Sequence, residues 1–146
     1  MTRPLSIALA GLGTVGSGVL RLLRDNADIV AARAGRALAV TAVSARDRGR
    51  DRGVPLAGLR WYDDPLALAA DPQVDVVVEL IGGADGPARA LVEAAIAAGK
   101  PVVTANKAMI ALHGAELAAA AERAGVALAF EAAVAGGIPV IKALRE

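Results

Sequence analysis

The chain has 146 residues, a length that suits one domain with its own hydrophobic core. Hydrophobic residues make up 55% of it and aromatic residues only 2%, so the core must consist mainly of Ala, Val, Leu and Ile. The 16 basic and 15 acidic residues leave a formal charge of +1, which excludes a general attraction to nucleic acid or to an anionic membrane. The absence of cysteine excludes disulfides, zinc–thiolate sites and thiol nucleophiles, and it fits a reducing compartment.

Apolar runs of strand length alternate along the chain with longer stretches of helical period. The first run breaks at Gly11, too early for a signal peptide or a membrane span, so we expect a soluble cytoplasmic protein. The runs are nearly continuous, as in strands buried on both faces of a parallel sheet. Strands are predicted over residues 5–11, 37–43, 74–82, 101–105 and 126–132. Helices are predicted over residues 14–33, 65–71, 86–99 and 107–125, with another opening near Pro139.

This order predicts an α/β fold of the Rossmann type, in which a doubly wound, mainly parallel sheet carries helices on both faces. One dinucleotide-binding domain is expected to span residues 1–146. No internal repeat is apparent. The one shift in composition is the charged stretch ARDRGRDRG at residues 45–53, which follows the second predicted strand.

A GxGxxG pattern joins the first predicted strand to the first predicted helix. Gly11 permits the sharp turn, Gly13 lets the backbone approach a pyrophosphate, and Gly16 allows the helix to pack closely on the sheet. This setting predicts a dinucleotide site, although a bare GxGxxG in a glycine-rich chain also fits a simple tight turn. The backbone N–H groups that would face the anion belong to Leu12, Thr14 and Val15.

The end of the second predicted strand bears on which dinucleotide binds. An acidic residue there receives the ribose 2′-hydroxyl of NAD, whereas an arginine accommodates the 2′-phosphate of NADP. Ser44 and Arg46 occupy this place, with further arginines behind them at positions 48, 50 and 52, so a guanidinium is available for a phosphate. NADP(H) is therefore the favoured cofactor, and NAD(H) stays open. The alternatives are a solvated charged loop balanced by Asp47 and Asp51, or an NAD site that uses Asp47.

The third and fourth predicted strands end in further candidate residues. Gly82 and Gly83 would let a ring or ribose pass close to the backbone. Glu79 either faces the site or is a strand-end carboxylate satisfied by backbone or water. Lysine is scarce beside arginine in this chain, so Lys107 at the end of the fourth strand invites a specific role, with a solvent-exposed lysine as the alternative. The only histidine, His113, falls in mid-helix and fits a surface or half-buried residue better than a catalytic one.

Four segments, GLGTVGSGV, VDVVVELIGG, GKPVVTANKAMIALHGAEL and FEAAVAGGIPVIKALR, together resemble the NAD(P)-binding part of homoserine dehydrogenase. That family interconverts L-aspartate 4-semialdehyde and L-homoserine with a nicotinamide cofactor, on the route to threonine, methionine and isoleucine. The resemblance implies that Leu12, Thr14 and Val15 cradle the pyrophosphate and that Arg46 takes the 2′-phosphate. It also implies that Thr104 and Lys107 lie by the nicotinamide and its ribose, with Lys107 in the catalytic neighbourhood.

The EAAVAGGIP segment resembles the monovalent-cation loop of the same family. The resemblance implies a sodium ion held by backbone carbonyls of Glu131, Val134, Gly136 and Ile138, and hard oxygen ligands suit such an ion. The alternative is a plain strand-to-helix turn in which Pro139 sets the first helical turn.

Members of that family continue for hundreds of residues, through a region that binds substrate and forms a homo-oligomer. The main catalytic groups are therefore expected beyond Glu146, the last residue of this chain. We expect the chain to be a fragment that binds NADP(H) and turns over little or nothing alone, because hydride transfer needs a held carbonyl and an aligned proton donor. Two other readings stay open. One is the cofactor domain of a related amino-acid or semialdehyde dehydrogenase, and the other is a non-catalytic NADP(H)-binding module.

Overall fold

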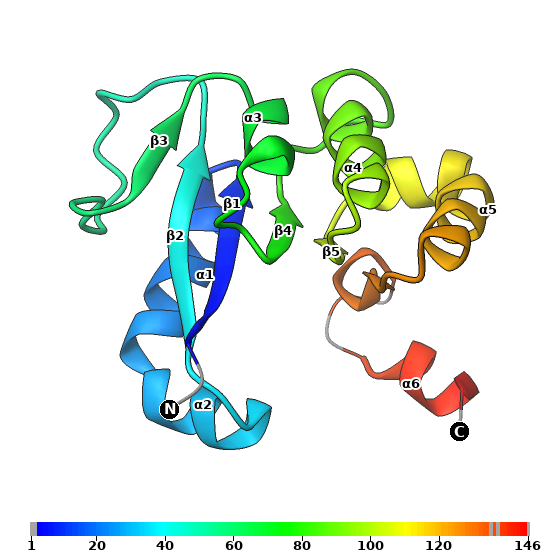
Figure 1. Cartoon of the computed structure of the whole chain (residues 1–146), viewed down its shortest axis with the longest axis horizontal. Coiled ribbons are helices and arrows are strands. Elements are labelled where there is room, and N and C mark those ends of the chain that lie inside the picture. Colours follow the sequence, from blue (N-terminus) through cyan, green and yellow to red (C-terminus); the bar gives the residue numbers. More distant parts are fainter. Residues whose placement is uncertain (1–2, 135, 137, 146) are drawn as a thin grey trace.

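The computed structural model describes residues 3–134, 136 and 138–145, and it contains one six-stranded sheet (Figure 1). The strand order is β3-β2-β1-β4-β5-β6 and every neighbouring pair is parallel, which confirms the predicted Rossmann-type fold. The strands are β1 Leu5–Ala10, β2 Leu38–Ser44, β3 Arg60–Tyr62, β4 Val76–Glu79, β5 Val102–Thr104 and β6 Leu128–Ala129. The helices are α1 Thr14–Asp25, α2 Ala27–Ala34, α3 Leu66–Ala70, α4 Pro87–Ala97, α5 Lys107–Ala124 and α6 Val140–Arg145, with a short 3-10 helix, η1, at Glu131–Ala133.

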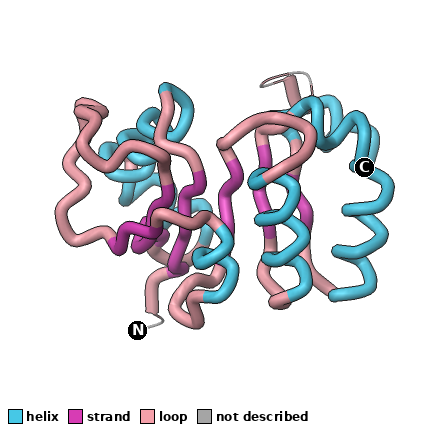
Figure 2. Tube along the Cα trace, turned by 90° about the horizontal axis from the view of Figure 1, so that it is seen from above, coloured by secondary structure: helices cyan, strands magenta, loops and turns pink. Residues whose placement is uncertain are grey.

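The sheet separates two hydrophobic clusters, because successive side chains of a strand point to opposite faces. Leu9 of β1 packs in the same cluster as Leu20 of α1, whereas its neighbour Ala8 belongs to the cluster under α3, α4 and α5. Figure 2 shows the strands as a central layer with helices on both sides. The covering is uneven, since Val103 of β5 is 39% exposed. None of the helices in the described residues is both long and apolar enough to cross a membrane.

Three elements differ from the sequence-based expectation. The strand predicted over residues 126–132 is limited to β6, and the 3-10 helix η1 replaces its end. Strand β3 was not predicted, because three residues reading RWY after a charged and glycine-containing loop carry no apolar run. The helix predicted over residues 14–33 is two helices that meet at Asn26, whose side-chain amide donates to the Leu22 carbonyl at 3.0 Å. A side chain that bonds to nearby backbone in this way competes with continuation of the helix.

The register of the strands brings three loops to one edge of the sheet. Ala10 of β1 lies beside Glu79 of β4, and Glu79 lies beside Thr104 of β5. These residues end or nearly end their strands, so the segments that follow them emerge side by side. In open α/β sheets this carboxyl edge is where ligands bind.

A polar cluster around Asp71 lies at the opposite edge of the sheet. Asp71 follows α3, its side chain is 5% exposed, and both of its carboxylate oxygens accept hydrogen bonds. One of its carboxylate oxygens accepts from Arg60 Nη2 at 2.8 Å and from the Tyr62 hydroxyl at 3.1 Å, and the other accepts from the Gln73 N–H at 2.8 Å. Burial alone would raise the pKa of Asp71, but the Gln73 N–H, the Arg60 guanidinium and the Tyr62 hydroxyl together hold it below its usual value. This cluster anchors β3 to the rest of the sheet.

Candidate functional site

The glycine loop after β1 uses its three glycines in different ways. Gly11 has φ of +98°, and a Cβ there would stand 2.5 Å from the Leu80 carbonyl oxygen. A Cβ at Gly16 would stand 1.9 Å from the Gly11 carbonyl oxygen, so both positions are dictated by close packing within the protein. At Gly13, no atom of the described residues lies within 4 Å of an added Cβ. Gly13 therefore leaves open space, as the approach of a pyrophosphate requires.

Helix α1 begins directly after this loop with its positive end uncovered. Gly13 is the N-cap residue, it offers no side-chain cap, and the first turn has no acidic residue. The N–H groups of Thr14 and Val15 lie in the first turn, where no preceding carbonyl of the helix can accept from them. Both residues are exposed, so these donors face solvent and can meet an anion.

A hollow of about 280 Å³, called here the glycine-loop hollow, lies between this loop and the charged stretch that follows β2. Its lining includes Leu12, Gly13 and Thr14 from one side and Arg50, Asp51 and Arg52 from the other. Arg46 is exposed at the end of β2 and is not part of this lining. The structure thus places Leu12 and Thr14, two of the three predicted pyrophosphate residues, opposite arginines, while Val15 lies outside this lining. The contact of Arg46 with a 2′-phosphate stays a prediction.

The charged stretch is a tandem repeat, Arg-Asp-Arg-Gly at residues 46–49 and again at 50–53, which corrects the expectation that the chain has no repeat. Each aspartate accepts from the N–H of the glycine two residues on, at 2.9 Å for Asp47 and 2.8 Å for Asp51. Among the described residues, neither carboxylate forms an ion pair with an arginine. The loop is therefore two Asx turns rather than a stretch balanced by salt bridges.

The end of β4 resolves the question about Glu79. Its side chain is fully buried and accepts from the N–H groups of Ile81 and Gly82 at 2.7 and 3.1 Å, and from the Thr104 hydroxyl at 2.6 Å. Glu79 is thus satisfied by backbone and by Thr104, and it fixes the loop that carries Gly82. A second hollow of about 140 Å³ lies over this loop, and its lining includes Val15 and Asn106 as well as Glu79 itself.

The segment after β5 is tied to the same network. Thr104 is fully buried, and its hydroxyl also accepts from the Asn106 N–H at 3.1 Å. Asn106 caps α5 by accepting from the Met109 N–H at 3.1 Å and donates from its amide to the Gly83 carbonyl at 2.6 Å. Lys107 follows as an exposed residue at the start of α5. Its nicotinamide contact and that of Thr104 stay predictions, but both residues stand at the predicted edge of the sheet.

The four residues predicted to hold sodium follow β6, while Ala135 and Gly137 between them lie outside the described residues. The Glu131 carbonyl accepts from the Val134 N–H at 3.2 Å, and the Ile138 carbonyl accepts from the Val140 N–H at 2.8 Å. Gly136 has φ of +45°. A carbonyl oxygen carries two lone pairs, so these bonds leave coordinating capacity at both positions.

Of the predicted catalytic residues, one lies within the described residues and the others are expected beyond them. Lys107 lies within it, at the carboxyl edge of the sheet. Glu146, beyond which the main catalytic groups are expected, itself lies outside the described residues. The structure therefore places one catalytic candidate, and the location of the other groups past Glu146 stays a prediction.

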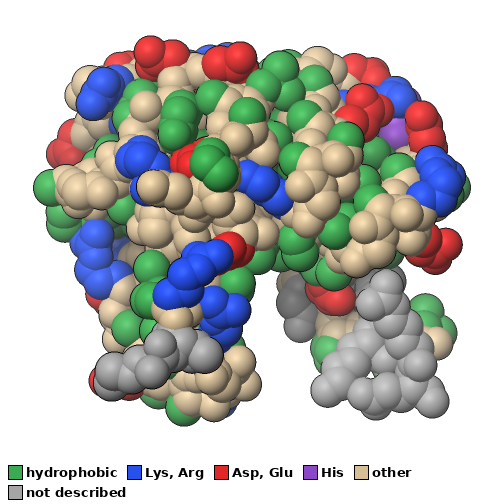
Figure 3. All heavy atoms as spheres, viewed as in Figure 1, with side chains coloured by type: hydrophobic (Ala, Val, Ile, Leu, Met, Phe, Trp, Pro, Cys, Tyr) green, Lys and Arg blue, Asp and Glu red, His purple; other side chains and the backbone are tan. Residues whose placement is uncertain are grey.

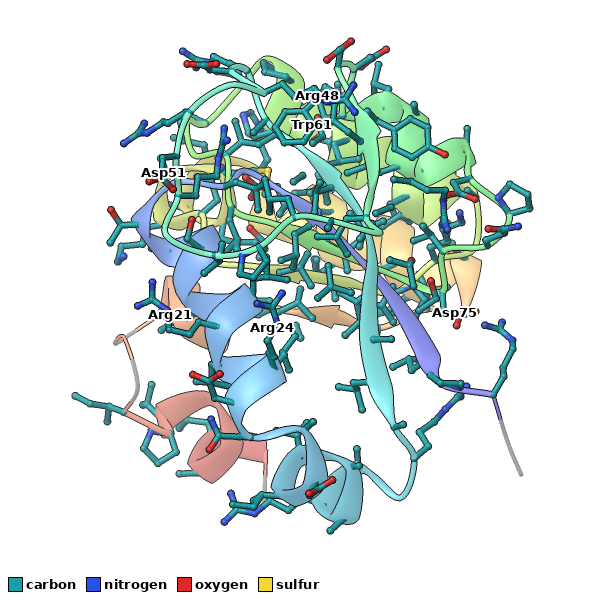
Figure 4. All side chains as sticks on the ribbon, turned by 90° about the vertical axis from the view of Figure 1, so that its left-hand side faces the viewer. Arg21, Arg24, Arg48, Asp51, Trp61 and Asp75 are labelled. Atoms are coloured by element: carbon teal, nitrogen blue, oxygen red, sulfur yellow. The ribbon has the colours of Figure 1, made fainter. Side chains whose placement is uncertain are left out.

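Sequence reasoning named Arg52 only as one of the arginines behind Arg46, and it missed Trp61. Arg52 is half-buried beside the glycine loop, and its guanidinium carbon lies 5.3 Å from the centre of the Trp61 ring. Arg48 lies 5.8 Å from the same ring, and Figure 4 shows the Arg48 and Trp61 side chains together, with Arg21 and Arg24 projecting from α1. The tandem repeat was the signal that could have drawn attention to this pair of arginines. Elsewhere on the face seen in Figure 3, basic and acidic side chains are interspersed.

A parallel sheet of this order, with a glycine loop after its first strand and an open helix N-terminus behind it, defines a dinucleotide-binding Rossmann domain. The family described as "Homoserine dehydrogenase, NAD binding domain" matches residues 11–131. The chain therefore belongs to the homoserine dehydrogenase family and comprises its domain for a nicotinamide dinucleotide.

Individual relatives agree with this assignment. Homoserine dehydrogenase from Pseudomonas aeruginosa is 50% identical over 146 residues, covering 99% of this chain and 32% of the relative. The enzyme from Corynebacterium glutamicum is 51% identical over 140 residues, with coverages of 95% and 31%. A crystal structure of a homoserine dehydrogenase from Thiobacillus denitrificans superposes with a TM-score of 0.91 at 51% identity, covering 99% of this chain and 33% of that one. The chain spans about a third of the length of these relatives.

Proposed function

We propose that this chain is the part of a homoserine dehydrogenase that binds NADP(H) in preference to NAD(H). The observation that carries the proposal is the open N-terminus of α1 facing an arginine-rich loop across the glycine-loop hollow. The helix N-terminus and its free N–H groups suit the pyrophosphate that both cofactors share. The exposed Arg46 at the end of β2 is the group for the 2′-phosphate that NADPH alone carries.

In a protein of the relatives' length, the bound cofactor would support reversible reduction of L-aspartate 4-semialdehyde to L-homoserine. The cofactor, held by the glycine loop and Arg46, would supply the hydride for the aldehyde carbon, and a proton would be delivered to the aldehyde oxygen. Lys107 is exposed at the predicted nicotinamide end of the site, and it is the residue of this chain that would lie beside the reacting groups. The substrate itself would be held by residues outside this domain, so the chain alone would bind cofactor with little or no turnover.

A sodium ion on the carbonyls of Glu131, Val134, Gly136 and Ile138 is a secondary part of the proposal. The lone pairs left free at Glu131 and Ile138 support it, as does a turn that includes Gly136. Its role would be to order the segment between β6 and α6 rather than to enter the chemistry. Thermal unfolding in sodium, compared with an equal concentration of tetramethylammonium, tests it: equal melting temperatures would contradict a sodium site.

The cofactor proposal is tested by titrating the chain with NADPH and NADH and following quenching of Trp61, the only tryptophan. Saturable binding of both cofactors, tighter for NADPH, is the expected result. No saturable binding of either cofactor would overturn the proposal. Equal affinities would contradict the preference for NADP(H) while leaving the dinucleotide site intact.

A further inference from the structure

In each Arg-Asp-Arg-Gly turn the aspartate accepts from the glycine N–H, but the two turns use the arginine between these residues differently. In each turn the arginine between aspartate and glycine lies over the ring of Trp61. Arg48, in the first turn, is exposed, and within the described residues no hydrogen bond joins its side chain to another group. Arg52, in the second turn, is half-buried and donates from all three of its nitrogens.

The bonds of Arg52 connect the charged loop to the glycine loop. Its Nε donates to the Leu12 carbonyl at 3.1 Å, across 40 positions of sequence. One terminal nitrogen donates to the Arg50 carbonyl at 2.7 Å and the other donates to the Asp47 carbonyl. A planar guanidinium can donate in these separate directions at once, whereas the single ammonium of lysine cannot copy the arrangement.

The Leu12 carbonyl belongs to the peptide group whose N–H is that of Gly13. Because a peptide is planar and trans, holding its oxygen also fixes the direction in which its N–H points. Arg52 supplies the shorter of two bonds to this oxygen, since the Ser17 hydroxyl donates to it at 3.4 Å. The orientation of the peptide at the mouth of the cofactor cradle therefore depends on a residue from the distant charged loop.

We infer that Arg52 is a positioning residue for the dinucleotide. It fixes the Leu12–Gly13 peptide within the loop that carries the predicted pyrophosphate donors, and at the same time holds the charged loop, with Arg50, against the glycine-loop hollow. This inference rests on the proposed function, and it assigns Arg52 no direct contact with the cofactor. The pyrophosphate is common to NADPH and NADH, so loss of the positioning affects both cofactors.

The test compares Arg52→Lys and Arg52→Gln with the matched controls Arg48→Lys and Arg48→Gln, using NADPH and NADH. Arg52→Lys keeps the charge and removes the three-way donation, so we expect both dissociation constants to rise about tenfold, with Arg52→Gln similar. The Arg48 variants should stay within about twofold of the wild type, because that side chain makes no bond to the backbone of the described residues. Binding is measured at low temperature, with the folded fraction followed by circular dichroism.

A second readout reports on the peptide itself. The Gly13 amide resonance of the unliganded chain should shift in both Arg52 variants and stay in place in both Arg48 variants. The inference would be overturned if Arg52→Lys bound the cofactors with wild-type affinity, or if the Arg48 and Arg52 variants lost affinity equally. Either result would mean that Arg52 contributes only its positive charge. An unmoved Gly13 resonance would also overturn it. Failure of the wild-type chain to bind either cofactor would instead refute the proposed function.

Discussion

The turns at residues 46–49 and 50–53 have identical sequences and different surroundings. The first turn follows the end of β2 and leaves its arginines exposed. The second turn lies against α1, whose Arg21 donates to the Gly53 carbonyl at 3.5 Å and whose Arg24 donates to the Pro55 carbonyl at 3.0 Å. Arg46, exposed after β2, is the residue proposed for the 2′-phosphate, whereas the guanidinium of Arg52 donates to carbonyls of the protein. The repeat shows that location, rather than local sequence, decides between these roles.

The largest expected effect comes from a variant outside both turns, which separates stability from cofactor binding. Asp71→Asn replaces an acceptor of Arg60 with an amide that can present N–H groups to it, and should lower the free energy of unfolding by about 2 kcal/mol. The melting temperature should fall by about 4–8 °C. Cofactor affinity at low temperature should not change, because the cluster lies at the opposite edge of the sheet.

The pH dependence of Asp71→Asn provides its control. The pKa of Asp71 is lowered in the folded chain, so the ionised carboxylate stabilises the fold above the unfolded-state pKa of about 4. This stabilisation is lost as the pH falls through the lowered pKa. The difference in melting temperature between wild type and variant should therefore shrink from pH 7 toward pH 3. A constant difference would show that the variant acts through packing alone.

The next largest effect is expected on cofactor affinity, when the first arginine of each turn is replaced. Arg46→Ala should weaken NADPH about tenfold and leave NADH nearly unchanged, because only NADPH offers a 2′-phosphate. Arg50→Ala should weaken both cofactors by about threefold, since Arg50 lines the hollow beside the glycine loop and acts there as a nearby positive charge. Fluorescence titration measures both. The reverse pattern would transfer the 2′-phosphate contact to Arg50.

A smaller effect separates the two glycines of the repeat. Gly53 has φ of +62°, so Gly53→Ala should cost about 1 kcal/mol of stability from backbone strain. Gly49 is not among the glycines with positive φ, and Gly49→Ala should be neutral or stabilise the chain slightly by restricting the unfolded state. Chemical denaturation with both variants side by side measures the difference. Equal losses would mean that the two turns have the same backbone conformation.

The smallest effect concerns the aspartates. Asp47→Ala and Asp51→Ala each remove one exposed bond to a glycine N–H and should each cost at most about 1 kcal/mol. Only Asp51→Ala should also weaken cofactor binding, by about twofold, because its turn contains Arg52 and borders the glycine-loop hollow. Denaturation and titration of the same samples distinguish these outcomes. Equal cofactor losses in both variants would contradict a special role for the second turn.

The sequence predicted the sheet because its longer strands are continuous apolar runs that fit only a buried layer. It also located the glycine loop, because Gly11, Gly13 and Gly16 are constrained by local geometry at a strand-to-helix junction. The split of the first helix escaped prediction, since Asn26 breaks it through a single side-chain bond within otherwise helical sequence. The strand β3 escaped because it is stabilised by its neighbour and by Asp71 rather than by its own hydrophobicity.

The candidate site was only partly predictable for a different reason. Residues that act through their backbone, such as Gly13, leave a pattern in the sequence. Arg52 acts through bonds to carbonyls of Leu12 and Asp47, and carbonyls look the same in every residue. The role of Glu79 likewise depended on Thr104 arriving from the next strand. Contacts between distant segments of this kind become visible only once the strands are placed side by side.

The repeat also has a consequence for how this loop can change over generations. Loss or gain of one whole four-residue unit would leave the sequence on either side of the loop unchanged. Each unit here coincides with one complete Asx turn, so such an event would remove or add a finished turn rather than a fragment of one. A chain with only the first unit would keep Arg46 near the end of β2 but would lack Arg52, which reaches the Leu12 carbonyl from the second turn. The duplicated loop allows the chain to keep both.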